Sequence, residues 1–344
     1  MRHNKLLSIS IAAAMSVSAL YAAPARADDD DDDVNTLRIR TVAPKASPWG
    51  ELLTSVASRI KKDTGGKIKI KIYWQSKSEP AAVRQCSQGK VGGIAVSIGS
   101  LASAVPELNA TELPYLFDNY AQADKAFTAA TPVIKKLMAD RGFILAVRGE
   151  NGFRHFASKD RFLTKPGDLA GLAMRAQPSK VHQDMYSALG ATPNPLQVAD
   201  VPTSLQNNVV RGWDNTLLYG KLANWVTDVN DPGADGIRYV TLSGHIYQGA
   251  VVAWCKPWFD KLPADIQAAL TKEDSAMETT GLKLVRAFND KLMPSQYAKL
   301  GIKMKELSAS EKSGFRSALT SVESKFIAAT PSAKELLNIL KANR

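Results

Sequence analysis

Short apolar strand patterns alternate with amphipathic helix patterns along this chain, and this alternation constrains the fold more than any other feature. Residues 37–41 and 67–74 have the pattern of strands, and residues 48–62 between them place apolar side chains on one helix face. The pattern then repeats, with helices at 79–87 and 120–139 and strands at 94–98 and 143–147. Strands that alternate with helices predict a parallel-rich α/β sheet.

The second part of the chain repeats the alternation and adds one long helical stretch. Strands are predicted at 154–157, 173–175, 210–213, 239–242 and 250–254, with helices at 179–189 and 202–207. Residues 263–292 then carry apolar residues close to one stripe, and at about 1.5 Å per residue a helix of this length would measure about 45 Å. Such a helix would contact more than one domain, and we expect a kink at Gly281.

The first 27 residues have the three parts of a secretory signal peptide. Arg2 and Lys5 precede an apolar run at 6–23, and Ala25-Arg26-Ala27 forms a small-x-small cleavage site. Cleavage is expected after Ala27. A retained membrane anchor is the alternative, but the run is short for a bilayer of about 30 Å and rich in Ala and Ser. The mature protein is therefore predicted to be soluble and exported, with no stable membrane anchor.

Charge is distributed unevenly along the chain. The formal net charge is +11, and Asp28–Asp33 are six consecutive acids, predicted to be a disordered leader at residues 28–33. Beyond this leader, 41 Lys and Arg face 27 Asp and Glu, which leaves about +14. The positive charge is scattered, as on the alternating strand at 67–74, and no aromatic-basic motif for stacking bases is present. Nucleic acid is therefore not an expected partner.

The sequence lacks the residue patterns that are typical of catalytic sites and metal sites. After loss of His3, the histidines His155, His182 and His245 lie far apart in sequence, and we interpret them as packed or surface residues. Ser97 lacks the first glycine of a G-x-S-x-G elbow, and no phosphate loop or dinucleotide fingerprint occurs. The sequence thus predicts no enzyme, no cofactor and no metal site.

The only two cysteines, Cys86 and Cys255, leave two interpretations open. An exported chain reaches an oxidising compartment, which permits a disulfide. Pairing requires Cα atoms closer than about 7 Å, however, and the residues are 169 positions apart in sequence. Two buried free thiols are the alternative.

Two arginines stand in apolar, strand-like surroundings. Arg154 lies between Phe153 and His155, and Arg175 ends a short apolar strand. Because a guanidinium cannot lose its charge, a partly buried one needs an anion, and its planar fork matches a carboxylate. Asn215 could add a neutral donor beside the same anion. The alternative is an internal ion pair with a residue such as Glu150 or Asp184.

The order of segments resembles the extracytoplasmic solute-binding subunit of tripartite ATP-independent periplasmic (TRAP) transporters, the DctP-like family. The segments that carry the resemblance are APKASPW at 43–49, GGKI at 65–68, ELPYLF at 112–117, GFR at 152–154, DLAGLAMR at 168–175, ALGATP at 188–193, the stretch at 205–215, the stretch at 241–247, and WFDKLP at 258–263. No single segment is decisive, but the ordered set is specific.

The resemblance implies roles for particular residues. The arginine that closes the DLxGLxxR segment, Arg175 here, would pair with the ligand carboxylate, and Arg154 and Asn215 would assist it. Trp213, Glu150 and Trp74 complete the predicted ligand-binding set. Two departures from the family pattern, the RGWDN segment at 211–215 and Val198 in place of a frequent aromatic residue, predict a reshaped wall around the ligand.

The resemblance also implies a two-domain α/β fold like that of type II periplasmic binding proteins, with the ligand in a cleft between the domains. Domain I would hold residues 34–152 and 240–281, and domain II would hold residues 153–239 and 282–344. A small organic acid would close the cleft by hinge motion and then be delivered to the TRAP membrane subunits. The alternatives are a sensor or scavenger that feeds a receptor, and an exported enzyme on the same scaffold.

Overall fold

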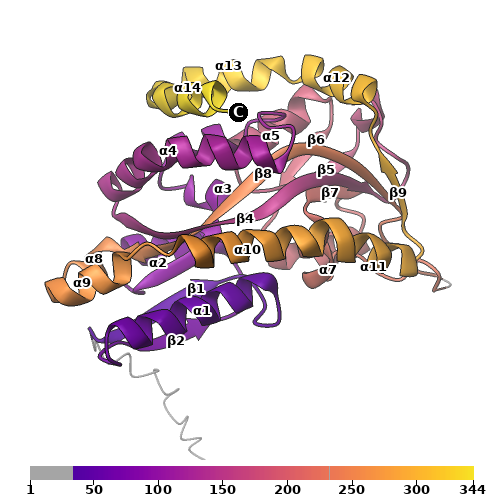
Figure 1. The fold of residues 1–344 in the computed structure, drawn as a ribbon. Coiled ribbons are helices and arrows are strands. Elements are labelled where there is room, and N and C mark those ends of the chain that lie inside the picture. The colour runs from indigo at the N-terminus through magenta and orange to yellow at the C-terminus, as the bar shows by residue number, and fades with distance from the viewer. Residues whose placement is uncertain (1–33, 232) are drawn as a thin grey trace, which may run out of the picture. The chain divides into compact units, whose positions relative to one another are not determined.

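The computed structural model describes residues 34–231 and 233–344, and these are built around one mixed β-sheet (Figure 1). Eight strands follow the order β2-β1-β3-β8-β4-β7-β5-β6, and β9 also pairs with β8. The predicted signal peptide and acidic leader lie outside the described residues. The strands are β1 (Thr36–Thr41), β2 (Lys69–Tyr73), β3 (Gly93–Ser97), β4 (Phe143–Ser158), β5 (Ala173–Ala176), β6 (Thr192–Pro195), β7 (Gly212–Asn215), β8 (Tyr239–Cys255) and β9 (Lys303–Glu306).

Parallel pairing dominates the two ends of the sheet, and antiparallel pairing its centre. Strand β1 is parallel to β2 and β3, β5 is parallel to β6 and β7, and β9 is parallel to β8. In the centre, β8 is antiparallel to both β3 and β4, and β4 is antiparallel to β7. The parallel-rich α/β prediction is therefore confirmed for the ends of the sheet, while the centre is antiparallel.

The two central strands are each longer than the sequence predicts. The separate strands expected at 143–147 and 154–157 are one strand, β4, and those expected at 239–242 and 250–254 are one strand, β8. Irregularities in the β4–β8 register at three places, one of them between Glu150 and Gly152, allow the strands to continue through polar and glycine residues. Both strands consequently run through the two halves of the sheet.

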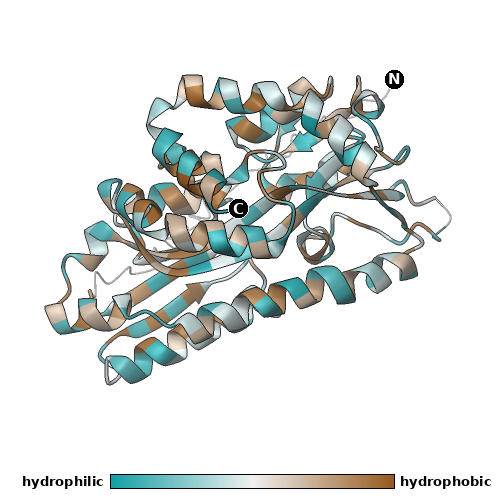
Figure 2. Ribbon diagram, turned by 45° about the horizontal axis from the view of Figure 1, so that its top comes forward, coloured by the Kyte–Doolittle hydropathy of each residue, from teal (hydrophilic) through white to brown (hydrophobic). Residues whose placement is uncertain are grey.

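Helices cover both faces of the sheet, and Figure 2 shows hydrophobic and hydrophilic residues alternating along most of them. One face carries a single core cluster that includes α2, α4, α5 and the C-terminal helices. The other face carries two separate clusters, one around β1 and α1 and one around β7 and α7. The α-helices are α1 (Pro48–Asp63), α2 (Glu79–Ser87), α3 (Ile98–Leu101), α4 (Tyr120–Asp140), α5 (Lys180–Ala188), α6 (Val201–Gln206), α7 (Leu217–Leu222), α8 (Lys256–Phe259), α9 (Ala264–Thr271), α10 (Ser275–Ala287), α11 (Met293–Lys299), α12 (Ala309–Ala318), α13 (Thr320–Ala329) and α14 (Lys334–Ala342).

The long helix exists, but its bounds differ from the prediction. It begins at Ser275, capped by Asp274, and continues through a π-helical turn at Phe288–Leu292 into α11 (Figure 1). Its α10 part contributes Val285 to the cluster around α1, and its α11 part contributes Tyr297 to the cluster around α7. The long helix therefore contacts two separate core clusters, while its contact with two domains stays a prediction.

The predicted kink at Gly281 is wrong. Gly281 lies inside α10, where an added Cβ would stand 3.2 Å from the side chain of Leu52, so close packing against α1 accounts for this glycine. The helical pattern breaks instead at Lys272–Asp274, between α9 and α10, and becomes irregular in the π-helical turn.

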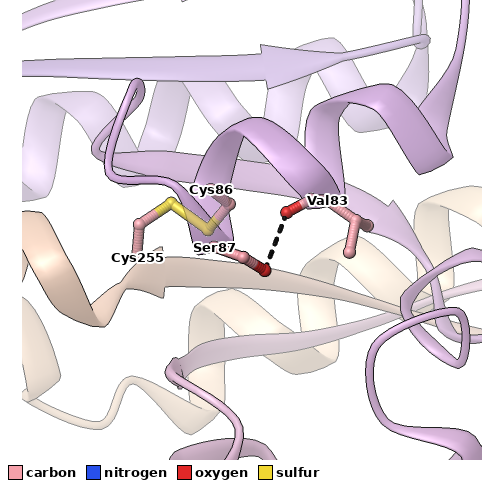
Figure 3. The surroundings of a disulfide bond; sticks show 4 residues. All are labelled: Val83, Cys86, Ser87 and Cys255. Atoms are coloured by element: carbon pink, nitrogen blue, oxygen red, sulfur yellow. Dashed lines mark hydrogen bonds between the residues drawn. A yellow bond between two sulfur atoms is a disulfide. The ribbon is translucent and has the colours of Figure 1, made fainter.

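Cys86 and Cys255 form a disulfide bond (Figure 3). Their Cα atoms are 5.1 Å apart, although 169 positions separate them in sequence. The bond joins the end of α2 to the end of β8 and decides between the two interpretations that the sequence leaves open. It fixes α2, whose first turn contributes to the cavity described below, to the central strand of the sheet.

Candidate ligand-binding cavity

A cavity of about 50 Å³ lies where several strands of the sheet end. Thr41 is the last residue of β1, Ser97 of β3 and Asn215 of β7, and Arg175 is one residue before the end of β5. In α/β sheets, ligands bind outside the carboxyl ends of the strands, which is where this cavity lies. The remaining lining residues are Val42, Ala43, Trp49, Glu79, Pro80, Ala95, Val96, Ser100, Asn151, Gln177, Pro178, Gln197, Val198, Tyr219, Gln248 and Ala250.

The cavity falls between the two core clusters that share one face of the sheet. Trp49 belongs to the cluster around α1, whereas Val198 and Tyr219 pack against the cluster around α7. Between these two sides, the long strands β4 and β8 contribute Asn151 and Gln248 to the cavity lining. The cavity has room for a small ligand.

Arg175 lines the cavity as a buried cation. Its exposed fraction is 1 %, and its Nε and Nη2 donate to the carbonyl oxygen of Leu196 at 3.2 and 3.0 Å. Its Nη1 has no hydrogen-bond partner among residues 34–231 and 233–344, and the guanidinium lies 4.8 Å from the ring centre of Trp225. Burial lowers the pKa of Arg175 to about 10, so the group remains charged at neutral pH. This side chain has room and need for an anion.

Arg154 has the opposite environment, because other residues of the protein already accept hydrogen bonds from its guanidinium. Its Nε donates to Asp214 at 2.6 Å and its Nη2 to the backbone oxygen of the same residue at 2.5 Å. Its Nη1 is shared among the side-chain oxygens of Gln177, Asn215 and Gln248. Arg154 is fully buried and is absent from the cavity lining. The internal ion pair considered from the sequence therefore exists for Arg154, with Asp214 as the partner rather than Glu150 or Asp184.

Asp214 is the centre of a buried polar network behind the cavity. Tyr186 donates to it at 2.9 Å, and ring nitrogens of His245 and His182 lie 3.4 and 3.7 Å from Oδ2. Burial alone would raise the pKa of Asp214, but the charge of Arg154 and the two neighbouring histidine rings outweigh it and hold this pKa well below its usual range. Two histidines far apart in sequence thus meet at one carboxylate. Within the described residues, no group of side chains has the composition of a metal site.

Asn215 lies in the cavity wall, and Arg154 contributes to its orientation. The Oδ1 atom accepts from Arg154 at 3.3 Å and from the backbone N–H of Thr216 at 2.8 Å. Because the oxygen is engaged, the amide nitrogen is the group left for a ligand, and it donates to no atom of the described chain. Asn215 can therefore present a neutral donor beside the cavity.

The other three predicted residues do not line the cavity. Glu150 is buried and accepts from Arg286 at 2.6 and 2.8 Å and from Tyr247 at 2.6 Å. Trp213 lies in the core cluster around α7 with its ring centre 5.6 Å from that of Trp225, and Trp74 packs at the edge of the cluster around α1. The internal packing and ion pairing of these side chains explain their absence from the lining.

Several lining residues were not predicted. Trp49, rather than Trp74, is the tryptophan of this side, and its indole N–H donates to the backbone oxygen of Glu150 and to Asn151, both at 3.1 Å. Glu79 is the first residue of α2, and its carboxylate accepts from Ser97 and Ser100. The sequence signal for Glu79 was an acid beside Pro80 at a helix start, which ordinary helix capping also explains. Its position in the cavity depends on tertiary packing.

The fold and the cavity define a periplasmic-binding-protein-like solute-binding protein with two domains. A model of the family DctP, bacterial extracellular solute-binding protein family 7, matches residues 39–330. The chain therefore belongs to the DctP family of TRAP extracytoplasmic solute-binding proteins, a transport family and not a family of enzymes. This confirms the resemblance seen in the sequence.

Individual relatives agree with this assignment. A solute-binding protein of Verminephrobacter eiseniae is 30 % identical over 298 residues, which are 85 % of this chain and 84 % of the relative. The crystal structure of a TRAP periplasmic solute-binding protein from Polaromonas sp. JS666, bound to D-erythronate, is 25 % identical with a TM-score of 0.81. It covers 90 % of this chain and 99 % of its own.

A third similarity concerns the fold. A TRAP periplasmic solute-binding protein from Sulfurospirillum deleyianum, with bound succinate, has a TM-score of 0.80 at 23 % identity. It covers 90 % of this chain and 99 % of its own. The two-domain fold predicted from the sequence is thereby confirmed, while the predicted residue boundaries of the domains stay a prediction. Within the described residues, no helix is both long and apolar enough to cross a bilayer.

Proposed function

We propose that this protein captures a small organic acid in the cavity through an ion pair between Arg175 and the ligand carboxylate. The observation that supports this proposal is that Arg175 is a buried cation on the cavity wall, and its Nη1 has no hydrogen-bond partner in the described chain. A buried charge is costly unless it is paired, and a carboxylate would complete the guanidinium fork. Relatives whose structures hold D-erythronate and succinate, both carboxylates, support this ligand class.

Asn215 and Arg154 have different proposed roles. Asn215 would donate its amide to the same carboxylate, because Arg154 and Thr216 already occupy its oxygen. Arg154 would act as a positioning residue, since its donors are used by Asp214, Gln177, Asn215 and Gln248. The direct ligand contact expected for Arg154 from the sequence is replaced in this proposal by an indirect one.

The two sides of the cavity would close around the acid and present a closed form to the TRAP membrane subunits in the periplasm. Contacts already cross the cavity, because Ser78 donates to Gln197 at 3.1 Å and Gln177 to Ser97 at 3.5 Å. The π-helical turn could take part in this motion, since its Asn289 bonds both Leu218 of α7 and Asn151 of β4. Loss of acid uptake on deletion of the gene would distinguish transport from sensing.

Mass spectrometry of small molecules released from gently purified protein tests the ligand class directly. A carboxylic acid should be released, and isothermal titration should show binding of that acid to the emptied protein but not of its primary amide. The amide keeps the shape of the acid and lacks the charge that Arg175 requires. Equal affinity for the acid and the amide would refute the proposal.

A further inference from the structure

The cavity contains a second fixed charge of opposite sign to Arg175. Glu79 lines the same cavity, and its carboxylate accepts from the backbone N–H of Ser97 at 2.9 Å, the hydroxyl of Ser97 at 2.7 Å and the hydroxyl of Ser100 at 2.6 Å. In the described chain Glu79 forms no ion pair with Lys, Arg or His. Three donors therefore hold an anion in place without neutralising it.

The position of Glu79 is rigid for reasons of local structure. Ser78 caps α2 by accepting from the N–H of Ala81, and Pro80 occupies the first turn. A carboxylate in the first turn is also favoured by the helix dipole. At its other end, α2 is fixed to β8 by the Cys86–Cys255 disulfide. Glu79 is thus held from both ends of its helix and is not a mobile surface acid.

The charges of Glu79 and Arg175 both lie in the wall of the same cavity. Tyr219, from the opposite side of the cavity, lies within electrostatic range of each: burial raises its pKa, the charge of Glu79 raises it further, and Arg175 lowers it. The remaining polar lining consists of neutral amides and hydroxyls, such as Gln177, Gln197 and Gln248. The cavity therefore has a cation, an anion and neutral hydrogen-bonding groups.

We infer that Glu79 selects the ligand by the chemical group at one end of the ligand, remote from the ligand carboxylate that Arg175 binds. The geometry favours an acid that carries one carboxylate for Arg175 and a hydrogen-bond donor, hydroxyl or ammonium, for Glu79. A second carboxylate at that end would meet a fixed like charge, and such repulsion in a partly buried site is a strong means of rejecting a competitor. This inference rests on the proposed function, because it assumes that Arg175 holds the first carboxylate.

Matched acids test the inference in the unmodified protein. D-erythronate and meso-tartrate share a carbon chain and differ only in a terminal CH₂OH or carboxylate, and D-galactonate and galactarate form the same pair with six carbons. Isothermal titration should show each monoacid binding about 10- to 100-fold more tightly than its diacid. A comparison of 4-hydroxybutyrate with 4-aminobutyrate then shows whether the donor is neutral or cationic.

The Glu79→Gln variant identifies the residue responsible. It keeps the shape and removes the charge, so the monoacid-to-diacid preference should fall by about tenfold or more, with the diacid gaining affinity. Glu51→Gln is the matched control, because Glu51 is an exposed acid in the first turn of α1, and this change should leave the preference unaltered. Circular dichroism checks that both variants fold.

The outcomes separate the two proposals. If the unmodified protein binds the diacids as tightly as the monoacids, or if Glu79→Gln leaves the preference unchanged, the role of Glu79 is refuted while carboxylate binding at Arg175 stands. If no carboxylate of the panel or from the released pool binds, the proposed function itself fails, and the inference fails with it.

Discussion

Replacement of Arg175 by methionine should weaken ligand binding without destabilising the ligand-free protein. The ligand carboxylate in the closed cavity would lose its buried partner, and truncation of one member of such a pair costs about 2–5 kcal/mol. That corresponds to a Kd raised roughly 30-fold to several thousand-fold. Folding of the ligand-free protein should respond differently, because Arg175 has no carboxylate partner in the described chain and its Nη1 lacks any hydrogen bond there.

The ligand-free Arg175→Met protein should therefore be at least as stable as the unmodified one, since a buried unpaired charge is removed. Isothermal titration with the acid identified by mass spectrometry measures the first effect, and urea unfolding without ligand measures the second. Arg175→Lys keeps the charge without the planar fork and should bind with intermediate affinity. Arg211→Met is the control, because Arg211 pairs with Asp160 outside the cavity. An Arg175→Met protein that binds the acid as tightly as the unmodified protein would refute the ion-pair argument.

Three further predictions concern stability. Arg154→Met should destabilise the protein by about 3–5 kcal/mol in urea unfolding, because it leaves a buried carboxylate without its cation; an unchanged midpoint would contradict the positioning role. Removal of the disulfide by the double change of Cys86 and Cys255 to alanine should cost about 2–5 kcal/mol, measured in the same way, and a stability equal to that of the unmodified protein would count against it. Burial lowers the pKa of His155 to about 3 from its ordinary 6.5, and its Nδ1 accepts from the N–H of Gly244 at 3.1 Å. The unfolded chain therefore binds a proton in this range that the folded protein does not, so the stability contributed by neutral His155 is complete above pH 6.5 and is lost as the pH falls toward 3. His155→Gln should flatten this part of the unfolding profile, and a profile identical to that of the unmodified protein would show that other groups set it.

The order and type of the elements could be predicted because they depend on local patterns. The helix at Glu79–Ser87 and the strand at Thr36–Thr41 follow from apolar periodicity and nearby punctuation. The centre of the sheet could not be predicted in the same way. The glycines and charged residues around Glu150 and Gly152 have the composition of a loop, yet they continue a strand because β8 pairs with residues on both sides of the irregularity between them.

Some residues of the candidate site could also be predicted from the sequence, and others could be identified only from the structure. Arg175 could be selected from the sequence as an arginine in apolar surroundings, and its segment also matches the family pattern. Arg154 has the same sequence signature, and only the structure distinguishes the two, because Asp214 neutralises one of them and no carboxylate neutralises the other. Glu79 carried no distinctive signal, since many helices begin with an acid for reasons of capping alone.

The sequence by itself determined the alternating α/β architecture, the long helix and the family, because periodicity and ordered motifs are properties of consecutive residues. The tertiary structure decided which cation stays unpaired, that Cys86 and Cys255 meet, and that Glu79 shares a cavity with Arg175. The physical reason is that a buried charge is satisfied by whatever group folding brings within about 3 Å, and for Arg154 that group lies 60 residues away.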